Sequence, residues 1–390
     1  MFETVFESNV QSNRVPMETW DINGTISELS YHTHNYLRYY GKFPPPVATN
    51  LINRFTKEGE TVLDNFVGCG TTLVEARILS RNSIGVDINP LGVLASKVKA
   101  TPLDVQVLKD QRDRLVEKIV DEISSFRKNG TVPLLTCLPK FPRIDYWFDK
   151  RQQVELGILK HHILDLKDND IKDFFLVGFA SIIRRASKAY DGEVRPHINP
   201  DKKQKKVFET FAKKTEDMIE RMGEFNKYAS KSVYSKAYVG DSRDLEFIDD
   251  ESVDLIVSHP SYLNVFDYAP VFRLEILWLG FDYTSFKKNE IRAWPATDKE
   301  IVGKYLEGME GCFSEMFRVL RKGRMCGVLI GDTTIRKKTF PTHKYLIDIA
   351  EKLGFSLHRT IRRKTYYGTG RYSYDPKALK EDYVLVFKKE

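Results

Sequence analysis

The chain has 390 residues, of which 42% are hydrophobic and 29% are charged, and its formal net charge is +7. The length exceeds one average domain, and the composition is that of a globular protein, which excludes an intrinsically disordered chain. The mildly basic charge suits a polyanionic partner without identifying one.

Targeting, membrane and metal signals are weak. Residues 1–9 carry two acids and no apolar run, so they predict no signal peptide. The longest apolar stretches, such as residues 174–179, are too short to span a bilayer. No CxxC pair occurs among the four cysteines, Cys69, Cys137, Cys312 and Cys326. We therefore expect a cytoplasmic protein with no membrane partner, no disulfide framework and no metal site.

Residues 1–30 read as irregular, and a helix is expected after the prolines at 44–46. The clearest unit follows. Residues 61–64 form a short buried strand, residues 64–72 (DNFVGCGTT) a glycine-rich turn, and residues 83–87 a second strand that ends in an acid, with a helix between them. This spacing predicts a βαβ unit with a tight loop at the carboxyl end of its first strand.

The pattern then changes twice. From residue 104 to residue 230 it is helical and strongly charged. Strands return at 233–239, 253–257, 325–330, 357–362 and 383–387, with helices expected at 300–320 and 343–353. The last two strands are close enough in sequence to pair as a hairpin. The chain therefore reads as an α/β sheet interrupted by a helical insertion.

The glycine-rich turn predicts a cofactor site. Glycines let the backbone approach a ligand where a Cβ would clash. Asp87 ends the next strand about twenty residues later, where a carboxylate accepts hydrogen bonds from the ribose hydroxyls of a nucleoside cofactor. No GxxxxGK[ST] motif occurs, which argues against an NTPase.

These motifs resemble those of the amino-type DNA methyltransferases, which make N6-methyladenine or N4-methylcytosine. Residues 64–72 resemble their motif I, residues 85–90 motif II, residues 240–245 motif III, and residues 34–46 motif X, which helps to close the cofactor pocket. The resemblance covers about 230 residues at both ends of the chain. It implies S-adenosylmethionine as cofactor, bound by Asp64, Phe66, Gly68, Gly70, Thr71, Thr72, Asp87, Ile88, Asp241 and Ser242.

The sequence VDLIVSHPSY at 253–262 resembles motif IV, usually written (D/N/S)PP(Y/F), and it implies four catalytic residues: His259, Pro260, Ser261 and Tyr262. An exocyclic amine is a poor nucleophile because its lone pair is delocalised into the ring. A polar side chain and the following backbone carbonyl can accept both N–H hydrogens, so that the nitrogen attacks the sulfonium methyl in line. The aromatic residue stacks on a base rotated out of the duplex.

The chain departs from that pattern at two positions, where His259 replaces Asp, Asn or Ser and Ser261 replaces the second proline. A neutral imidazole accepts one hydrogen bond in the right tautomer. A protonated His259 would repel the amine hydrogens, so activity is expected to fall at acidic pH. The same departures keep open an inactive relative that only binds DNA. No Pro-Cys pair is present, which argues against cytosine-C5 chemistry.

Basic residues with nearby aromatics in the insertion suit contact with DNA. The candidates are Arg184, Arg185, Lys188, Lys202 and Lys203. Trp147 and Phe148 read as core residues rather than stacking residues, and the lysine run has an equally good interpretation as a solvated face. A second basic-aromatic patch lies at residues 362–372, in the expected terminal hairpin.

The predicted fold is α/β, a class I methyltransferase (Rossmann-like), doubly wound sheet with a terminal antiparallel hairpin and a mainly helical insertion. Residues 1–103 and 231–390 form the catalytic domain, and residues 104–230 a target-recognition region. The predicted function is site-specific methylation of double-stranded DNA, with cytosine N4 slightly favoured over adenine N6, beside a cognate restriction endonuclease. The alternatives are an RNA exocyclic-amine methyltransferase and a catalytically degraded DNA-binding relative.

Overall fold

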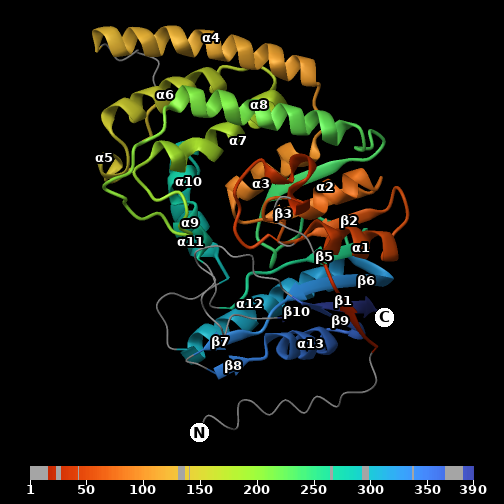
Figure 1. Cartoon of the computed structure of the whole chain (residues 1–390). Coiled ribbons are helices and arrows are strands. Elements are labelled where there is room, and N and C mark those ends of the chain that lie inside the picture. The colour runs from red at the N-terminus through yellow and green to blue at the C-terminus, as the bar shows by residue number, and fades with distance from the viewer. Residues whose placement is uncertain are drawn as a thin grey trace.

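The computed structural model describes residues 16–22, 28–42, 44–130, 137–139, 141–263, 267–291, 298–335, 338–364 and 381–390. Within these ranges the chain is an α/β protein with a layer of helices stacked beyond one face of the sheet (Figure 1). The predicted fold class is confirmed.

The central sheet has the strand order β1-β9-β10-β6-β5-β2-β3-β4. Among the described strands of this sheet, β10 alone runs antiparallel to its neighbours. The predicted terminal hairpin is thus β9–β10. The strands are β1 (Met17–Trp20), β2 (Thr61–Asp64), β3 (Asn82–Asp87), β4 (Ser235–Val239), β5 (Val253–Ser258), β6 (Leu320–Ile330), β9 (Phe355–Lys364) and β10 (Glu381–Lys389), with a separate β7 (Thr333–Ile335) and β8 (Lys338–Phe340) pair.

Helices cover both faces of the sheet. On one face lie α1 (Pro45–Phe55), α2 (Thr71–Ile78) and α3 (Pro90–Ala100); on the other lie α12 (Asp298–Val319) and α13 (Thr342–Lys352). Successive strand residues point to opposite faces. Accordingly Val62 packs in the cluster that holds α1, and Leu63 packs in the cluster that holds α12 and α13. All six residues of β5 are buried, because this strand is central and covered twice.

The helical insertion follows α3. It contains α4 (Val105–Asn129), α5 (Ile144–Trp147), α6 (Lys150–Leu164), α7 (Asn169–Ala186) and α8 (Val207–Asn226). Asp104 and Asp168 cap α4 and α7 by accepting hydrogen bonds from backbone N–H groups of the first turn. As predicted for the core, Phe148 is fully buried.

Three further helices come from the chain after β5: α9 (Tyr268–Val271), α10 (Arg273–Leu279) and α11 (Tyr283–Asn289). The sequence did not predict them. Helix α10 packs against α7, and Trp278 is fully buried between Phe148 and Phe179, with ring centroids 5.4 and 6.1 Å away. The predicted boundary at residue 231 assigns these helices to the catalytic domain, whereas their packing joins them to the insertion.

Two short 3-10 turns, η2 (Glu28–Ser30) and η3 (His32–Asn35), precede α1. The prediction of irregular structure for residues 1–30 was wrong at β1, which pairs in parallel with β9 from Met17 opposite Thr360.

No helix within the described ranges is long and apolar enough to cross a membrane.

Replacing Trp278 with alanine should lower the free energy of unfolding by about 3–5 kcal/mol, because it removes a large buried ring between two others. Urea denaturation measures the change. Tyr228→Ala is the control, since that side chain is 59% exposed and its loss should cost less than about 1 kcal/mol. Equal losses in both variants would contradict the proposed packing role.

Candidate functional site

A cleft opens at the carboxyl ends of β2, β3 and β5, and the space within it and its mouth is about 1050 Å³. The chain leaves β2 toward β3 on one side and β5 toward β6 on the other, so the cleft occupies the switch point of the sheet, where α/β proteins bind ligands. It brings together predicted cofactor and catalytic residues from distant segments: Phe66, Gly68, Thr71, Asp87, Ile88, Asp241, Ser242, His259, Ser261 and Tyr262.

The remaining predicted residues, Asp64, Gly70, Thr72 and Pro260, are not part of the cleft lining. Asp64 is buried behind the glycine turn, where it accepts hydrogen bonds from Thr72 Oγ1 at 2.6 Å and from the Phe66 N–H at 3.1 Å. Burial raises the pKa of Asp64 to about 7. Asp64 therefore shapes the turn rather than facing a ligand.

The turn requires glycine at two positions. Gly68 and Gly70 have φ values of +50° and +86°, which side chains rarely adopt. A Cβ on Gly70 would lie 2.7 Å from Ser96 Cα. From α3, Gly92 approaches so closely that a Cβ there would lie 2.4 Å from the Gly68 carbonyl oxygen. The turn is thus wedged against the first half of α3.

Asp87 binds the turn from the end of β3. Its carboxylate accepts hydrogen bonds from the N–H groups of Gly68 and Asn89, both at 2.8 Å. Burial raises the pKa of Asp87 to about 6. Because a carboxylate offers about four acceptor positions, two remain for hydroxyl donors of a ligand in the cleft.

Residues 31–49 are fastened to α2 by a buried carboxylate. Glu75 accepts hydrogen bonds from Tyr31 at 2.9 Å and Thr49 at 2.7 Å, and it contacts His34 Nε2 at 2.8 Å. These bonds fix the segment predicted to close the cofactor pocket. Three of its residues, Tyr39, Gly41 and Lys42, line the cleft.

Two hydroxyl groups fix the backbone of the turn after β5 by hydrogen bonds. Tyr305 on α12 donates to the Ser261 carbonyl at 3.1 Å, and Thr333 donates to the Leu263 carbonyl at 2.7 Å. His259 and Tyr262 meet edge to face with ring centroids 5.4 Å apart. Pro260 is buried, so the turn presents His259, Ser261 and Tyr262 to the cleft.

Desolvation, and then the nearby Arg363 guanidinium, lower the pKa of His259 to about 3. Arg363 is itself paired with Asp382, which also accepts a long hydrogen bond from Tyr262 at 3.5 Å. His259 is therefore neutral throughout the ordinary pH range. The loss of activity that is expected when His259 becomes protonated should therefore occur only near pH 3.

Two buried polar side chains at the cleft end of the sheet have no hydrogen-bond partner: Asn65, beyond β2, and Ser258, at the end of β5. Buried polar groups are normally satisfied, and each unsatisfied group costs free energy. Neither side chain lines the cleft, so a buried water is the expected partner of each.

Sequence reasoning missed several lining residues, among them Tyr268, Phe286, Glu290, Ile291 and Tyr305. Most come from the helices after β5, whose sequence carries no recognised motif. Tyr268 and Phe272 stack with Tyr39, with centroids 6.0 and 4.8 Å from its ring. Asn264 lies outside the described residues, whereas Asp267 pairs with Arg195.

The predicted DNA contacts divide into two groups. Arg184 is buried and donates to the carbonyl groups of Glu193, Val194 and Val271. Lys202 has a 7% exposed side chain and donates to the carbonyl groups of Arg184 and Ala189. Both cations are occupied by contacts within the fold, which argues against the predicted contacts with DNA.

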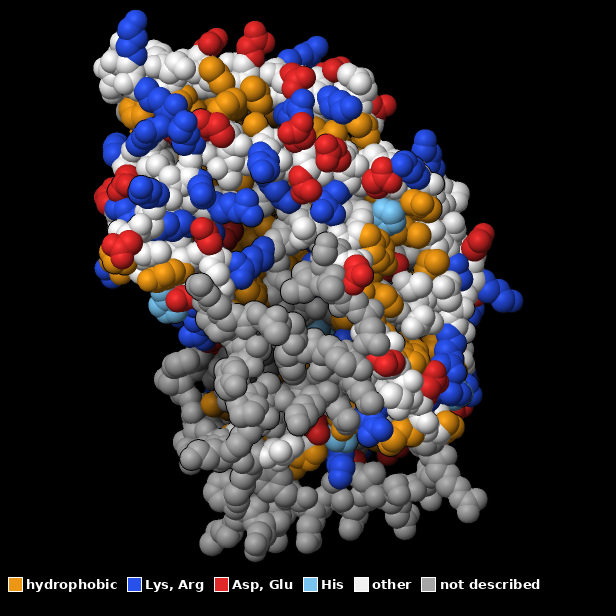
Figure 2. Space-filling model, in the orientation of Figure 1, with side chains coloured by type: hydrophobic (Ala, Val, Ile, Leu, Met, Phe, Trp, Pro, Cys, Tyr) orange, Lys and Arg blue, Asp and Glu red, His pale blue; other side chains and the backbone are white. Residues whose placement is uncertain are grey.

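The other three candidates lie at the surface. Lys188 is partly exposed and pairs with Asp149 at 2.6 Å, whereas Arg185 and Lys203 are exposed. Lys and Arg side chains gather over the helical part of the molecule, in the upper half of Figure 2. In the patch at 362–372, Arg362 and Arg363 are described on β9, but residues 365–372 lie outside the described ranges.

No group of three or more His, Cys, Asp or Glu side chains with the geometry of a metal site occurs among the described residues. The four cysteines are free thiols.

The known proteins that this chain resembles are named as DNA methylases or methyltransferases. Residues 4–96 match the family model N6_N4_Mtase, described as DNA methylase. The type II methyltransferase M.MvaI of Kocuria varians is 27% identical over 72% of this chain and 65% of its own length. The type II methyltransferase M.MjaII of Methanocaldococcus jannaschii is 24% identical over 90% of this chain and 81% of its own length. The chain thus spans slightly less than two thirds of the first relative.

Among solved structures, a TehB-like SAM-dependent methyltransferase from Corynebacterium glutamicum is 11% identical, over 88% of this chain and 87% of that one, with a TM-score of 0.33.

Replacing Gly92 with alanine should weaken binding of S-adenosylmethionine by about tenfold or more, because the new methyl group displaces the Gly68 carbonyl and with it the turn. Isothermal titration calorimetry measures the affinity. Gly303→Ala in α12 is the matched control, since a Cβ there meets nothing within 4 Å. Unchanged affinity in the Gly92 variant would show that the turn tolerates displacement.

Proposed function

We propose that the chain is an amino-type DNA methyltransferase, in line with its N-terminal match and its curated relatives, and that it transfers a methyl group from S-adenosylmethionine to the exocyclic amine of a base in double-stranded DNA. The observation that carries the proposal is the cleft itself. The glycine turn with Asp87 and the His-Pro-Ser-Tyr turn line one cavity at the switch point of the sheet.

The residues present fit the cofactor. Asp87 keeps acceptor positions for two ribose hydroxyls, Gly68 leaves the turn backbone open to close approach, and Asp241, paired with Arg243, lines the cleft where the adenine would lie. Ile88 and Phe66 supply apolar contact. The bound cofactor supplies an electrophilic methyl group on a sulfonium sulfur.

The His-Pro-Ser-Tyr turn would hold the base. Neutral His259 accepts one amine hydrogen, the Pro260 carbonyl accepts the second, and Tyr262 stacks on the flipped ring. Methyl transfer forms an N–C bond, breaks an S–C bond and leaves one proton to be lost from nitrogen. With a pKa of about 3, His259 is a hydrogen-bond acceptor but a weak base, so this proton passes to solvent.

We also propose that the chain acts beside a cognate restriction endonuclease, because its curated relatives are type II methyltransferases. Cytosine N4 is slightly favoured over adenine N6 as the target.

The test is incubation with tritiated S-adenosylmethionine and mixed-sequence duplex DNA, followed by digestion and identification of the labelled nucleoside. Label in N4-methyldeoxycytidine supports the proposal. Label only in an RNA control would replace it, and no transfer despite cofactor binding would indicate a degraded relative.

His259→Leu should reduce methylation by about 100-fold or more, because it removes an acceptor used in the transition state, whereas cofactor affinity should be unchanged. His259→Asn should retain more activity, since an amide oxygen supplies the acceptor. Single-turnover rates with tritiated cofactor measure the effect. Equal rates in the wild type and the leucine variant would exclude His259 from the reaction.

Cofactor affinity should fall below pH 6. The pKa of Asp87 is raised to about 6, so the ionised acceptor is present above that pH and is lost as pH decreases. The fall should be about tenfold at pH 5 if the anion is required, because the pH is then one unit below the pKa. Asp87→Asn should bind more weakly at pH 8 and show a flat profile. A profile that persists in this variant would assign the titration to another group, such as Asp64.

A further inference from the structure

Residues 187–199 form a closed loop between α7 and α8, here called the clamped loop. Its ends are joined by the Ala189–Ile198 bridge and by backbone hydrogen bonds from Tyr190 to His197 at 2.9 Å and from Asn199 to Lys188 at 2.8 Å. The loop is thus a small hairpin that projects from the helical insertion.

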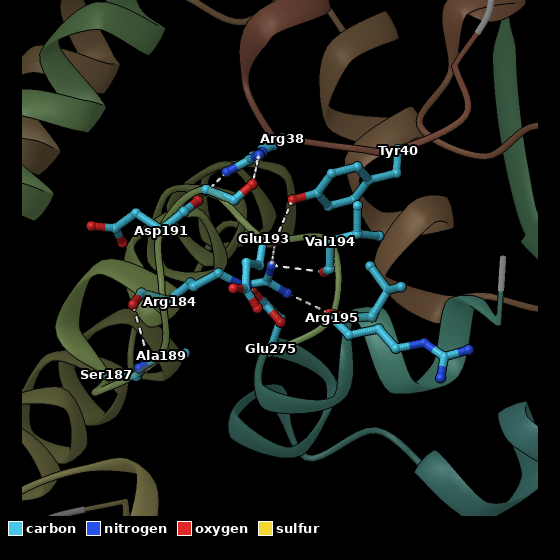
Figure 3. A network of polar contacts seen from close by, with 12 residues as sticks. Arg38, Tyr40, Arg184, Ser187, Ala189, Asp191, Glu193, Val194, Arg195 and Glu275 are labelled. Atoms are coloured by element: carbon cyan, nitrogen blue, oxygen red, sulfur yellow. Dashed lines mark hydrogen bonds and ion pairs between the residues drawn. The ribbon is translucent and has the colours of Figure 1, made fainter. Parts of the chain in front are cut away.

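The backbone of this loop is held by side chains from outside it (Figure 3). Arg38 donates to the carbonyl groups of Asp191 and Gly192, and Tyr40 donates to that of Glu193 at 2.8 Å. Arg184 donates to the carbonyl groups of Glu193 at 2.9 Å and Val194 at 3.0 Å. Four consecutive carbonyl groups, those of residues 191–194, therefore accept hydrogen bonds from outside the loop.

Arg184 is anchored in turn. It also donates to the Val271 carbonyl, and its guanidinium lies 3.6 Å from the Glu275 carboxylate on α10. The clamp thus rests on three separate parts of the chain: the segment before α1, helix α7 and the helices after β5. A loop whose backbone is ordered before binding loses less conformational entropy when it meets a partner.

The clamped loop contacts two segments that also contribute to the cleft. Tyr40, which donates to the loop, lies between Tyr39 and Gly41, and both of these line the cleft. Arg195 of the loop pairs with Asp267, the sequence neighbour of the lining residue Tyr268. These contacts connect the loop to the segments that border the cleft, where the nucleotides that flank a bound base would have to lie.

The surroundings of the loop are strongly basic. Residues 184–206 hold eight Lys or Arg and three Asp or Glu, a net charge of +5 where the whole chain has +7. Arg185, Lys203 and Lys205 are exposed and pair with no carboxylate among the described residues. Such cations suit phosphate groups, which give affinity without sequence information.

The loop also carries exposed groups suited to base edges. The side chain of His197 is 66% exposed, and its Nδ1 lies 2.6 Å from the Glu193 carboxylate. In the tautomer that donates from Nδ1 to Glu193, Nε2 is an acceptor directed away from that carboxylate. Such an acceptor can bond the amino group of adenine or of cytosine, which occupies a different place in the major groove of each base pair. Tyr190, 40% exposed, lies beside it on the hairpin.

We propose that the clamped loop reads the base pairs that flank the target base in duplex DNA, with His197 contacting a base edge and with Arg185 and Lys203 contacting phosphates. The inference rests on the proposed DNA methylation and adds the element that selects the sequence. In this proposal the DNA contacts are made by exposed side chains in place of Arg184 and Lys202. Those two cations instead hold the loop through hydrogen bonds to its backbone.

The experiment compares three variants of the full chain with the wild type. His197→Ala tests base contact, the double variant Arg185→Ala/Lys203→Ala tests phosphate contact, and Arg114→Ala, on the exposed face of α4, is the matched control. Methylation of a duplex library with randomised flanks gives the sequence preference. Binding to one duplex at several salt concentrations gives the slope of log K against log [salt]. Cofactor affinity and melting temperature are measured for each.

We expect His197→Ala to reduce discrimination at one or two flanking positions by about tenfold or more, with the salt slope unchanged. The double variant should weaken binding to all sequences and reduce the slope by about 0.9 for each lost phosphate contact. Arg114→Ala should behave as wild type. An unaltered sequence preference in His197→Ala, or a double variant whose slope equals that of the control, would overturn the proposal.

Failure of the proposed function has a different signature. A wild-type chain that binds duplex DNA without methylating it, and whose salt slope falls in the double variant, would reject the enzymatic function and keep the loop as a DNA contact. A wild-type chain that does not bind duplex DNA would reject both.

Discussion

The hydrogen bond from the Gly68 N–H to the Asp87 carboxylate is the contact on which the site depends. It joins the turn after β2 to the end of β3, so the two strands that supply the cofactor cradle have one fixed geometry. Other contacts reinforce it from behind, through Asp64 and Thr72 and through the close approach of Gly92. This arrangement buries the Asp87 carboxylate, and the loss of solvation disfavours its ionised form and raises its pKa.

The same logic operates at the turn after β5. Its backbone is fixed by hydroxyl groups of Tyr305 and Thr333, and its variable position is filled by an imidazole that burial and Arg363 keep neutral. A neutral imidazole can offer one acceptor lone pair where the resembled motif has the oxygen of Asp, Asn or Ser. The surroundings, rather than the residue type alone, set its chemistry.

The parts of the fold that the sequence predicted are local. The β2–turn–α2–β3 unit occupies about thirty consecutive residues, with two glycines and an acid at characteristic spacings. The turn at 258–262 follows a strand that is apolar from 253 to 257 except at Asp254. The parts it did not predict depend on distant partners. Strand β1 forms because Met17 pairs with Thr360, and Tyr268 lines the cleft because α10 is anchored by Phe148 and Phe179. Arg184 was assigned to DNA because a sequence does not reveal whether a cation faces solvent or a row of carbonyl groups.

The burial of Trp278 against α7 limits how the helical insertion can be exchanged between proteins. The helices after β5 are about forty residues downstream of the insertion's end, yet they complete its core. Residues 104–230 are therefore not a unit that recombination could replace alone. A replacement segment would have to arrive together with a matching stretch around residues 268–289, or it would leave a cavity in the helical layer.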